Sequence, residues 1–179
     1  MKLLFCDNSF KEFINFRGDI VSHFNRKGYD ITIVAPINIS NYQPRKNIQL
    51  YDINLQRSGM NPYQDLKYLI KLIKIYKQEK PDIIFHYTIK PNIYGSIAAK
   101  VVGTPSISII TGLGYAFNHN GLKSAIARLL YKNSLKIPKK ILVLNKSNLD
   151  HLVNHNIIPS SKVILLEGGE GINLHIFND

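Results

Sequence analysis

Short apolar runs alternate with longer amphipathic stretches along the whole chain, and this alternation is what most restricts the fold. The apolar runs predict strands at 2–6, 31–35, 48–53, 83–85, 106–110, 140–144 and 163–166. The stretches between them predict helices at 16–27, 62–80, 92–102, 122–135 and 147–154. Strands that alternate with helices indicate right-handed βαβ units, so we expect an α/β fold with a mainly parallel sheet and helices on both faces.

The length of 179 residues fits one domain, and we expect residues 1–179 to form a single unit. Cys6 is the only cysteine, so the chain forms no internal disulfide and suits a reducing compartment. The first apolar run stops at Asp7, which is too short for a secretion signal, and no stretch reaches the ~20 residues of a membrane-spanning helix. The net charge of +11 favours acidic partners such as anionic lipid, a phosphorylated ligand or nucleic acid.

Several common kinds of binding site are not expected, because the sequence lacks the motifs that form them. The turn after the first strand lacks the G-x-G-x-x-G of dinucleotide binding, and the chain contains no P-loop, so we expect no cofactor. His151 and His155 stand four residues apart on a predicted helix, which is a spacing seen in zinc sites. Without neighbouring ligands, a solvated helix face is the better interpretation of this pair, and we predict no metal.

The polar stretch after the strand 83–85 is the first candidate site, because such sheets bind ligands beyond the carboxyl ends of their strands. His86 leaves this strand, where an imidazole can share a hydroxyl proton, and we expect it at the mouth of a cleft as the catalytic residue. Lys90 and the helix start near Pro91 add positive charge and free N–H groups. The alternative is a histidine held by internal hydrogen bonds.

The glycines after the strand 106–110 form a second candidate site. Gly112 and Gly114 let a ligand approach the backbone, whose amides can bind a phosphate or sugar oxygen, and Tyr115 and Phe117 stand beside them. The alternative is an ordinary turn into the next helix.

Two basic clusters predict a membrane-facing side. The helix 62–80 has a lysine-rich polar face, and the helix 122–135 repeats the signal, which suits an anionic membrane surface. We expect six side chains to face the membrane: Lys67, Lys71, Lys74, Lys123, Arg128 and Lys132. An ordinary surface helix is the alternative. Nucleic acid is not an expected partner, because no recognition motif or aromatic stacking platform is present.

Four stretches carry a resemblance to a known family: "FINFRGDIVSHFNRKGYDITIVAP", "LQRSGMNP", "KPDIIFHYTIKPNIYGSIAAKVVGTPSISIITGLGYAF" and "GGEGINLHIF". They resemble the N-terminal half of family 4 (GT-B) glycosyltransferases, in the branch that builds capsular, O-antigen and related bacterial glycans on polyprenyl-diphosphate carriers. The resemblance implies a Rossmann-like domain that binds the acceptor. It also implies a C-terminal domain that binds the nucleotide-sugar, with residues 167–179 as the start of the linker.

This chain departs from the family pattern at three places. Asp7-Asn8-Ser9 replaces a Gly pair after the first strand, Thr111 replaces a histidine, and Gly169-Glu170-Gly171 replaces Gly-Ser-Gly. Because threonine cannot act as a general base, His86 is the better ionisable candidate. The predicted acceptor- or phosphate-binding set is Asn8, Ser9, Arg17, Lys90, Asn92, Thr111, Gly112 and Gly114.

We therefore expect the acceptor-binding half of a retaining, metal-independent glycosyltransferase on the inner face of the cytoplasmic membrane. Its partners would be a nucleotide-sugar and a lipid-linked saccharide, and the 179-residue chain alone is expected to be inactive. The alternatives are a non-catalytic basic module that binds membrane or nucleic acid, and an epimerase-like enzyme without a cofactor.

Overall fold

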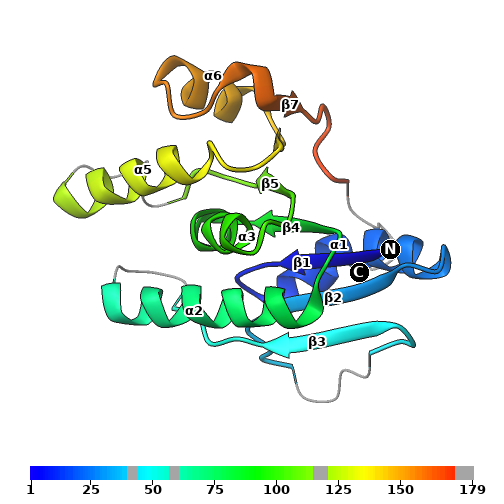
Figure 1. Ribbon diagram of the computed structural model, residues 1–179. Coiled ribbons are helices and arrows are strands. Elements are labelled where there is room, and N and C mark those ends of the chain that lie inside the picture. The colour runs from blue at the N-terminus through cyan, green and yellow to red at the C-terminus, as the bar shows by residue number, and fades with distance from the viewer. Residues whose placement is uncertain (40–43, 57–60, 115–120, 172–179) are drawn as a thin grey trace.

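The computed structural model describes residues 1–39, 44–56, 61–114 and 121–171, without the side chain of Lys123. Seven parallel strands form one sheet in the order β3-β2-β1-β4-β5-β6-β7 (Figure 1). The strands are β1 (Lys2–Cys6), β2 (Asp30–Ala35), β3 (Ile48–Asp52), β4 (Ile83–Tyr87), β5 (Ser106–Ile110), β6 (Lys140–Val143) and β7 (Val163–Leu165). The predicted parallel α/β sheet is confirmed.

Helices cover both faces of the sheet. They are α1 (Phe10–Arg26), α2 (Pro62–Glu79), α3 (Ser96–Val102), α5 (Leu122–Ser134) and α6 (Lys146–Asn154), with a π-helical turn η1 (Pro91–Gly95) and a 3₁₀ turn η2 (Ser160–Lys162). Figure 1 shows α1 on one side of the sheet and α2 and α3 on the other. This division follows from right-handed crossovers, because the chain moves one way from β1 to β2 and the opposite way from β3 to β4.

Alternation along the strands supplies the two cores. Leu3 and Phe5 of β1 pack with α1 on one face, while Leu4 and Cys6 pack under α2 and α3 on the other. Residues on both faces are apolar because a parallel sheet is covered on both sides.

The first helix begins earlier than its predicted start at Phe16. Ser9 caps α1, and its side-chain oxygen accepts a hydrogen bond from the Glu12 backbone N–H at 3.3 Å. The Ser-x-x-Glu spacing of a capping box is the sequence signal for this start. The earlier start leaves only Asp7, Asn8 and Ser9 between β1 and α1.

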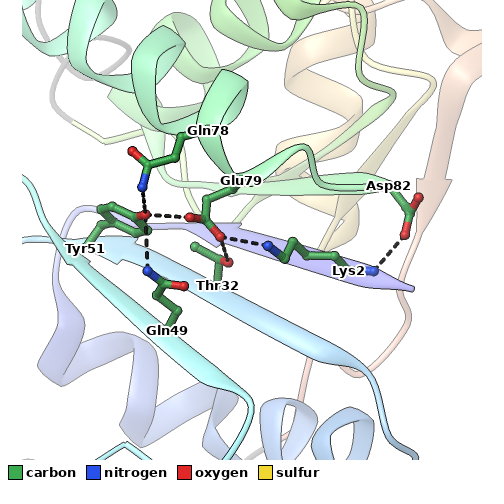
Figure 2. A network of polar contacts seen from close by, with 7 residues as sticks. All are labelled: Lys2, Thr32, Gln49, Tyr51, Gln78, Glu79 and Asp82. Atoms are coloured by element: carbon green, nitrogen blue, oxygen red, sulfur yellow. Dashed lines mark hydrogen bonds and ion pairs between the residues drawn. The ribbon is translucent and has the colours of Figure 1, made fainter.

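A polar network fixes the C-terminal end of α2 to the sheet (Figure 2). It comprises Lys2, Thr32, Gln49, Tyr51, Gln78, Glu79 and Asp82. Glu79 is the centre: its carboxylate accepts from the Lys2 ammonium at 3.0 Å, from the Thr32 hydroxyl at 3.1 Å and from the Tyr51 hydroxyl. Burial opposes ionisation of Glu79, but these three donors outweigh it and lower its pKa. The network is therefore a structural clamp.

Candidate functional site

The order of the strands places a candidate site between β1 and β4. The chain moves from β1 to β2 in one direction and from β4 to β5 in the other, so β1 and β4 flank the point where the topology reverses. Ligands of open α/β sheets bind in the crevice at such a point, beyond the carboxyl ends of the strands. Asp7 follows β1 and Thr88 follows β4, so both lie at this crevice.

Asp7 is a buried carboxylate at this edge. Its Oδ1 accepts from the Asn8 backbone N–H at 2.6 Å, and its Oδ2 lies 3.6 Å from Nη1 of Arg17. Burial raises the pKa of Asp7 to about 6, although the Arg17 charge and the N–H groups of Asn8 and Ser9 act to lower it. A carboxyl with this pKa changes its charge close to neutral pH.

Arg17 connects Asp7 to the far end of the sequence. Its Nη2 donates to Oε2 of Glu170 at 2.9 Å, and its guanidinium carbon lies 4.4 Å from the centre of the Tyr87 ring. Arg17 is buried, and its cation faces two carboxylates and the rings of Tyr87 and, at 5.9 Å, Phe16. The site therefore joins α1, β1, β4 and the segment that follows β7.

Glu170 reaches the site through a glycine-rich turn. Gly168, Gly169 and Gly171 have φ angles of 82°, 72° and 71°, which only glycine adopts readily. The sequence marked Gly169-Glu170-Gly171 as a departure from the family pattern but did not predict Glu170 as a site residue. Only the tertiary fold shows it, since Arg17 is 153 positions away.

Four buried polar atoms at this edge have no hydrogen-bond partner among the described residues. They are Oδ2 of Asp7, Oδ1 of Asn8, Nε of Arg17 and Oγ1 of Thr88. Buried polar atoms are almost always paired in folded proteins, so a cluster of unpaired ones needs a cause. Thr88 also has a φ of 66°, which is uncommon for a β-branched residue and typical of functional sites. A ligand rich in hydroxyl groups would satisfy these atoms.

The predicted position of His86 is wrong. The residue is fully buried, and its Nε2 lies 3.1 Å from the Tyr76 hydroxyl under α2. β4 continues through Tyr87, so His86 lies within the strand opposite Cys6 and faces the helices. Burial lowers the pKa of His86 to about 3. The alternative interpretation, a histidine held by internal bonds, fits these observations, and the imidazole does not reach the crevice.

Three other predicted contacts are engaged inside the domain. The Lys90 ammonium forms an ion pair with Asp65 of α2 at 2.7 Å, with both side chains largely buried. Asn92 is buried and donates to the Ile109 carbonyl at 3.0 Å. Ser9 caps α1. Of the predicted polar contacts, Asn8, Arg17 and the backbone N–H of Ser9 lie around Asp7, and ligand binding by every member of the set stays a prediction.

The glycine turn after β5 lies at the same edge of the sheet. Thr111 and Gly112 are partly buried, while Gly114 is exposed with a φ of 58°. A Cβ on Gly114 would lie 2.8 Å from Cδ1 of Ile89, the far end of a side chain that can turn away, so the positive φ rather than packing favours glycine here, independently of any ligand. Tyr115 and Phe117 lie outside the described residues.

A comparison with known families decides the class of protein. The family described as Glycosyl transferase 4-like matches residues 2–145, which is more than half of the chain. The chain belongs to this family. The predicted resemblance to family 4 glycosyltransferases is thereby confirmed.

Two relatives have names that describe lipid-linked acceptors. The N,N'-diacetylbacillosaminyl-diphospho-undecaprenol alpha-1,3-N-acetylgalactosaminyltransferase of Campylobacter jejuni is 25% identical over 99% of this chain and 48% of its own length. The UDP-Gal:alpha-D-GlcNAc-diphosphoundecaprenol alpha-1,3-galactosyltransferase of Escherichia coli is 29% identical over 59% of this chain and 28% of its own length. The chain thus spans about half of the first glycosyltransferase and less of the second.

The fold of this glycosyltransferase family member is shared with solved structures. A glycosyltransferase from Rickettsia africae superposes with a TM-score of 0.66 and 16% identity, over 99% of this chain and 45% of its own. At this identity the likeness shows the fold alone, and it agrees with the predicted Rossmann-like half of a GT-B architecture.

The predicted membrane-facing side chains differ in their surroundings. Lys67, Lys71 and Lys74 are exposed on α2, and the Lys67 ammonium lies 4.2 Å from the Tyr63 ring centre. Arg128 and Lys132 of α5 are only partly exposed, and the Lys123 side chain lies outside the described residues. In the described part of the chain, no helix is both long and apolar enough to cross a bilayer.

Proposed function

We propose that this domain is the acceptor-binding half of a retaining, metal-independent glycosyltransferase. It would hold a polyprenyl-diphosphate-linked saccharide while a sugar is transferred from a nucleotide-sugar. Family membership and the names of the two relatives support this class of acceptor and donor. We further propose that a second domain binds the nucleotide-sugar and that residues 167–179 begin the connection to it.

The four buried atoms at the crevice between β1 and β4 that have no hydrogen-bond partner among the described residues carry this proposal. Oδ2 of Asp7 and Oδ1 of Asn8 are acceptors that need donors, and sugar hydroxyls supply them. Oγ1 of Thr88 can donate a hydrogen bond to a hydroxyl group of the same sugar or accept one from it. In the proposed mechanism Asp7 orients an acceptor hydroxyl toward the donor sugar, and no residue of this domain forms a covalent intermediate.

The charges around Arg17 distinguish a sugar from a phosphate at this position. The guanidinium already faces the carboxylates of Asp7 and Glu170, so an added phosphate would meet two like charges for one opposite charge. Neutral hydroxyl groups avoid this repulsion. We therefore place the saccharide, rather than the diphosphate, beside Arg17.

A titration followed by amide NMR tests this assignment in the 179-residue chain. We expect a methyl N-acetylhexosaminide to shift the amides of residues 7–9 and 88, and Asp7→Asn to weaken these shifts about tenfold. Asp19→Asn is the matched control, because Asp19 is an exposed carboxylate of α1. Shifts centred elsewhere, or unchanged in Asp7→Asn, would reject the site.

A turnover assay tests the division into two domains. We expect the purified 179-residue chain to transfer no sugar from nucleotide-sugars to lipid-linked acceptors, because the proposed donor-binding half lies outside it. Clear turnover by this chain alone would overturn the two-domain proposal.

We also propose that the domain docks on the inner face of the cytoplasmic membrane. The exposed lysines of α2 and the net charge of +11 support an anionic lipid surface, and each lysine near such a surface contributes about 1 kcal/mol. Sedimentation with phosphatidylglycerol-containing vesicles should fall as salt rises. Equal binding to neutral vesicles, or no binding to either, would reject this part of the proposal.

A further inference from the structure

The outward face of α5 is apolar. Leu122, Ile126 and Leu129 are 78%, 41% and 60% exposed, and their spacing of four and three residues places them on one side of the helix. The other side of α5 packs on the sheet through the buried Tyr131. A surface helix ordinarily turns its polar side outward, so this arrangement leaves an apolar stripe for a partner.

The first half of α2 carries a second stripe of the same kind. Tyr63, Leu66 and Ile70 are exposed on the face that also carries Lys67, Lys71 and Lys74. Aromatic and aliphatic side chains beside lysines are typical of helices that lie in a membrane interface, where the rings and ammonium groups meet the headgroups. On α2, apolar and cationic residues therefore share one surface.

Both stripes lie toward the edge of the sheet that holds the candidate site. α2 leads into the start of β4 and α5 into the start of β6, so each helix begins at the edge where the strands end (Figure 1). Tyr63, Leu66, Leu122 and Ile126 belong to the first two turns of their helices. A planar partner at this edge would lie next to the crevice between β1 and β4.

We propose that α5 inserts Leu122, Ile126 and Leu129 into the acyl-chain boundary of an anionic bilayer while the lysines of α2 contact the headgroups. This inference rests on the proposed membrane docking and adds apolar insertion by a named helix. A second copy of the chain is a poorer occupant, because two molecules of charge +11 repel each other and an anionic surface attracts both. Insertion next to the crevice would present it to saccharides attached to lipid.

Single tryptophans can report this insertion, because the chain contains no tryptophan. Leu129→Trp places a fluorophore on the apolar stripe. Val101→Trp is the matched control: Val101 is 56% exposed at the end of α3, which leads to the edge where β5 starts. With vesicles of phosphatidylcholine and phosphatidylglycerol, we expect a blue shift and quenching by brominated acyl chains in Leu129→Trp and neither change in Val101→Trp.

Salt and a polar substitution separate insertion from charge attraction. Near 1 M salt the screening length falls to about 3 Å, so binding by lysines alone should vanish while an inserted fraction remains. Leu129→Ser should lower vesicle partitioning about tenfold, and Val101→Ser should leave it unchanged. These experiments use no sugar substrate, so their outcome is independent of the glycosyltransferase proposal.

Three results would overturn the inference. Vesicle binding without a blue shift in Leu129→Trp would mean docking by charge alone and would leave the membrane proposal standing. A blue shift that grows with protein concentration without vesicles, together with a dimer in analytical ultracentrifugation, would assign the stripe to a second copy. No vesicle binding by the unsubstituted chain would reject both insertion and docking.

Discussion

Arg17 and Glu170 form an ion pair of 2.9 Å between residues 153 positions apart. The pair ties the middle of α1 to the glycine-rich turn that follows β7, the last strand of the sheet. Arg17 also lies against Asp7 and the Tyr87 ring, so the turn is fixed to the crevice between β1 and β4. In a two-domain enzyme, this contact would couple the acceptor site to the chain segment that leaves the domain.

Loss of the Glu170 charge should loosen this turn. Glu170→Gln removes the charge from a largely buried pair, and we expect it to lower the free energy of unfolding by about 1–3 kcal/mol. Backbone hydrogen exchange of residues 167–171 should also become faster. Glu167→Gln is the matched control, because Glu167 is an exposed carboxylate three residues earlier. Equal effects of the two substitutions would show that the ion pair does not hold the turn.

The sheet could be predicted from the sequence because its strands are short apolar runs bounded by polar residues. All seven strands lie within two residues of their predicted ends. The helix starts were harder, since α1 begins six residues before its predicted start. Its first turn contains Phe10 and Phe13, both buried against the sheet, while the prediction rested on the later residues and overlooked the Ser9–Glu12 capping signal.

The candidate site was predicted only in part, because it depends on long-range contacts. Arg17 and Asn8 were named from the sequence, and the structure places them beside Asp7. Glu170 was not named, since nothing local links it to Arg17. The predicted strand 83–85 ends two residues too early: β4 extends through Tyr87, so His86 lies inside the strand, and its side chain faces the helices α2 and α3 instead of the crevice.

The raised pKa of Asp7 predicts that ionisation of this carboxyl destabilises the folded state as the pH rises. The carboxyl binds a proton up to about pH 6 in the folded chain but only to about pH 4 when unfolded. Between these values the Asp7 carboxyl of the folded state holds more protons, so the contribution of Asp7 to stability falls with rising pH, by about 3 kcal/mol in total. Asp7→Asn should remove this fall. Urea unfolding of the unsubstituted chain and of Asp7→Asn at pH values from about 4 to about 7, a range that roughly spans the two pKa values, measures this contribution. A difference in unfolding free energy between the two chains that does not change with pH would contradict the prediction.

His86 should act in the opposite direction over an overlapping range. Its pKa is lowered to about 3, so the unfolded chain binds a proton near pH 6.5 that the folded chain does not take up. Stability that is present above about pH 6.5 is therefore lost as pH falls, by about 1.4 kcal/mol per unit. From about pH 4 to 6 this loss and the Asp7 effect nearly cancel. We expect a steeper acid loss in Asp7→Asn and a shallower one in His86→Gln, measured in the same urea series.

The Lys90–Asp65 ion pair should contribute to the stability of the fold, so substitution of Lys90 should lower the free energy of unfolding even without a ligand. Lys90→Met leaves the Asp65 carboxylate buried without its cation, and we expect a loss of about 3 kcal/mol or more. The double variant Lys90→Met with Asp65→Leu should recover much of this loss, because two apolar groups replace the pair. Lys71→Met is the control for removal of an exposed charge from α2. A double variant no more stable than Lys90→Met would contradict the role of the pair.

Gly95 and His86 should be coupled by direct contact. A Cβ on Gly95 would lie 2.4 Å from Cδ2 and 2.5 Å from Nε2 of His86, whereas the φ of −65° suits any residue. The cost of Gly95→Ala is therefore steric, and we expect a loss of about 1–3 kcal/mol in urea unfolding at neutral pH. Gly18→Ala is the matched control inside α1: its nearest neighbour, Cγ2 of Ile14, is 3.7 Å away, and helix propensity should raise stability by up to about 1 kcal/mol.

A double-mutant cycle shows whether the imidazole is the cause. His86→Ala alone should destabilise, because it leaves a cavity and the Tyr76 hydroxyl without its partner. In the His86→Ala background the clash is gone, so Gly95→Ala should cost about 1 kcal/mol less than in the unsubstituted chain, or even stabilise it. Costs that add within about 0.5 kcal/mol would mean that another neighbour of Gly95, and not His86, requires the glycine.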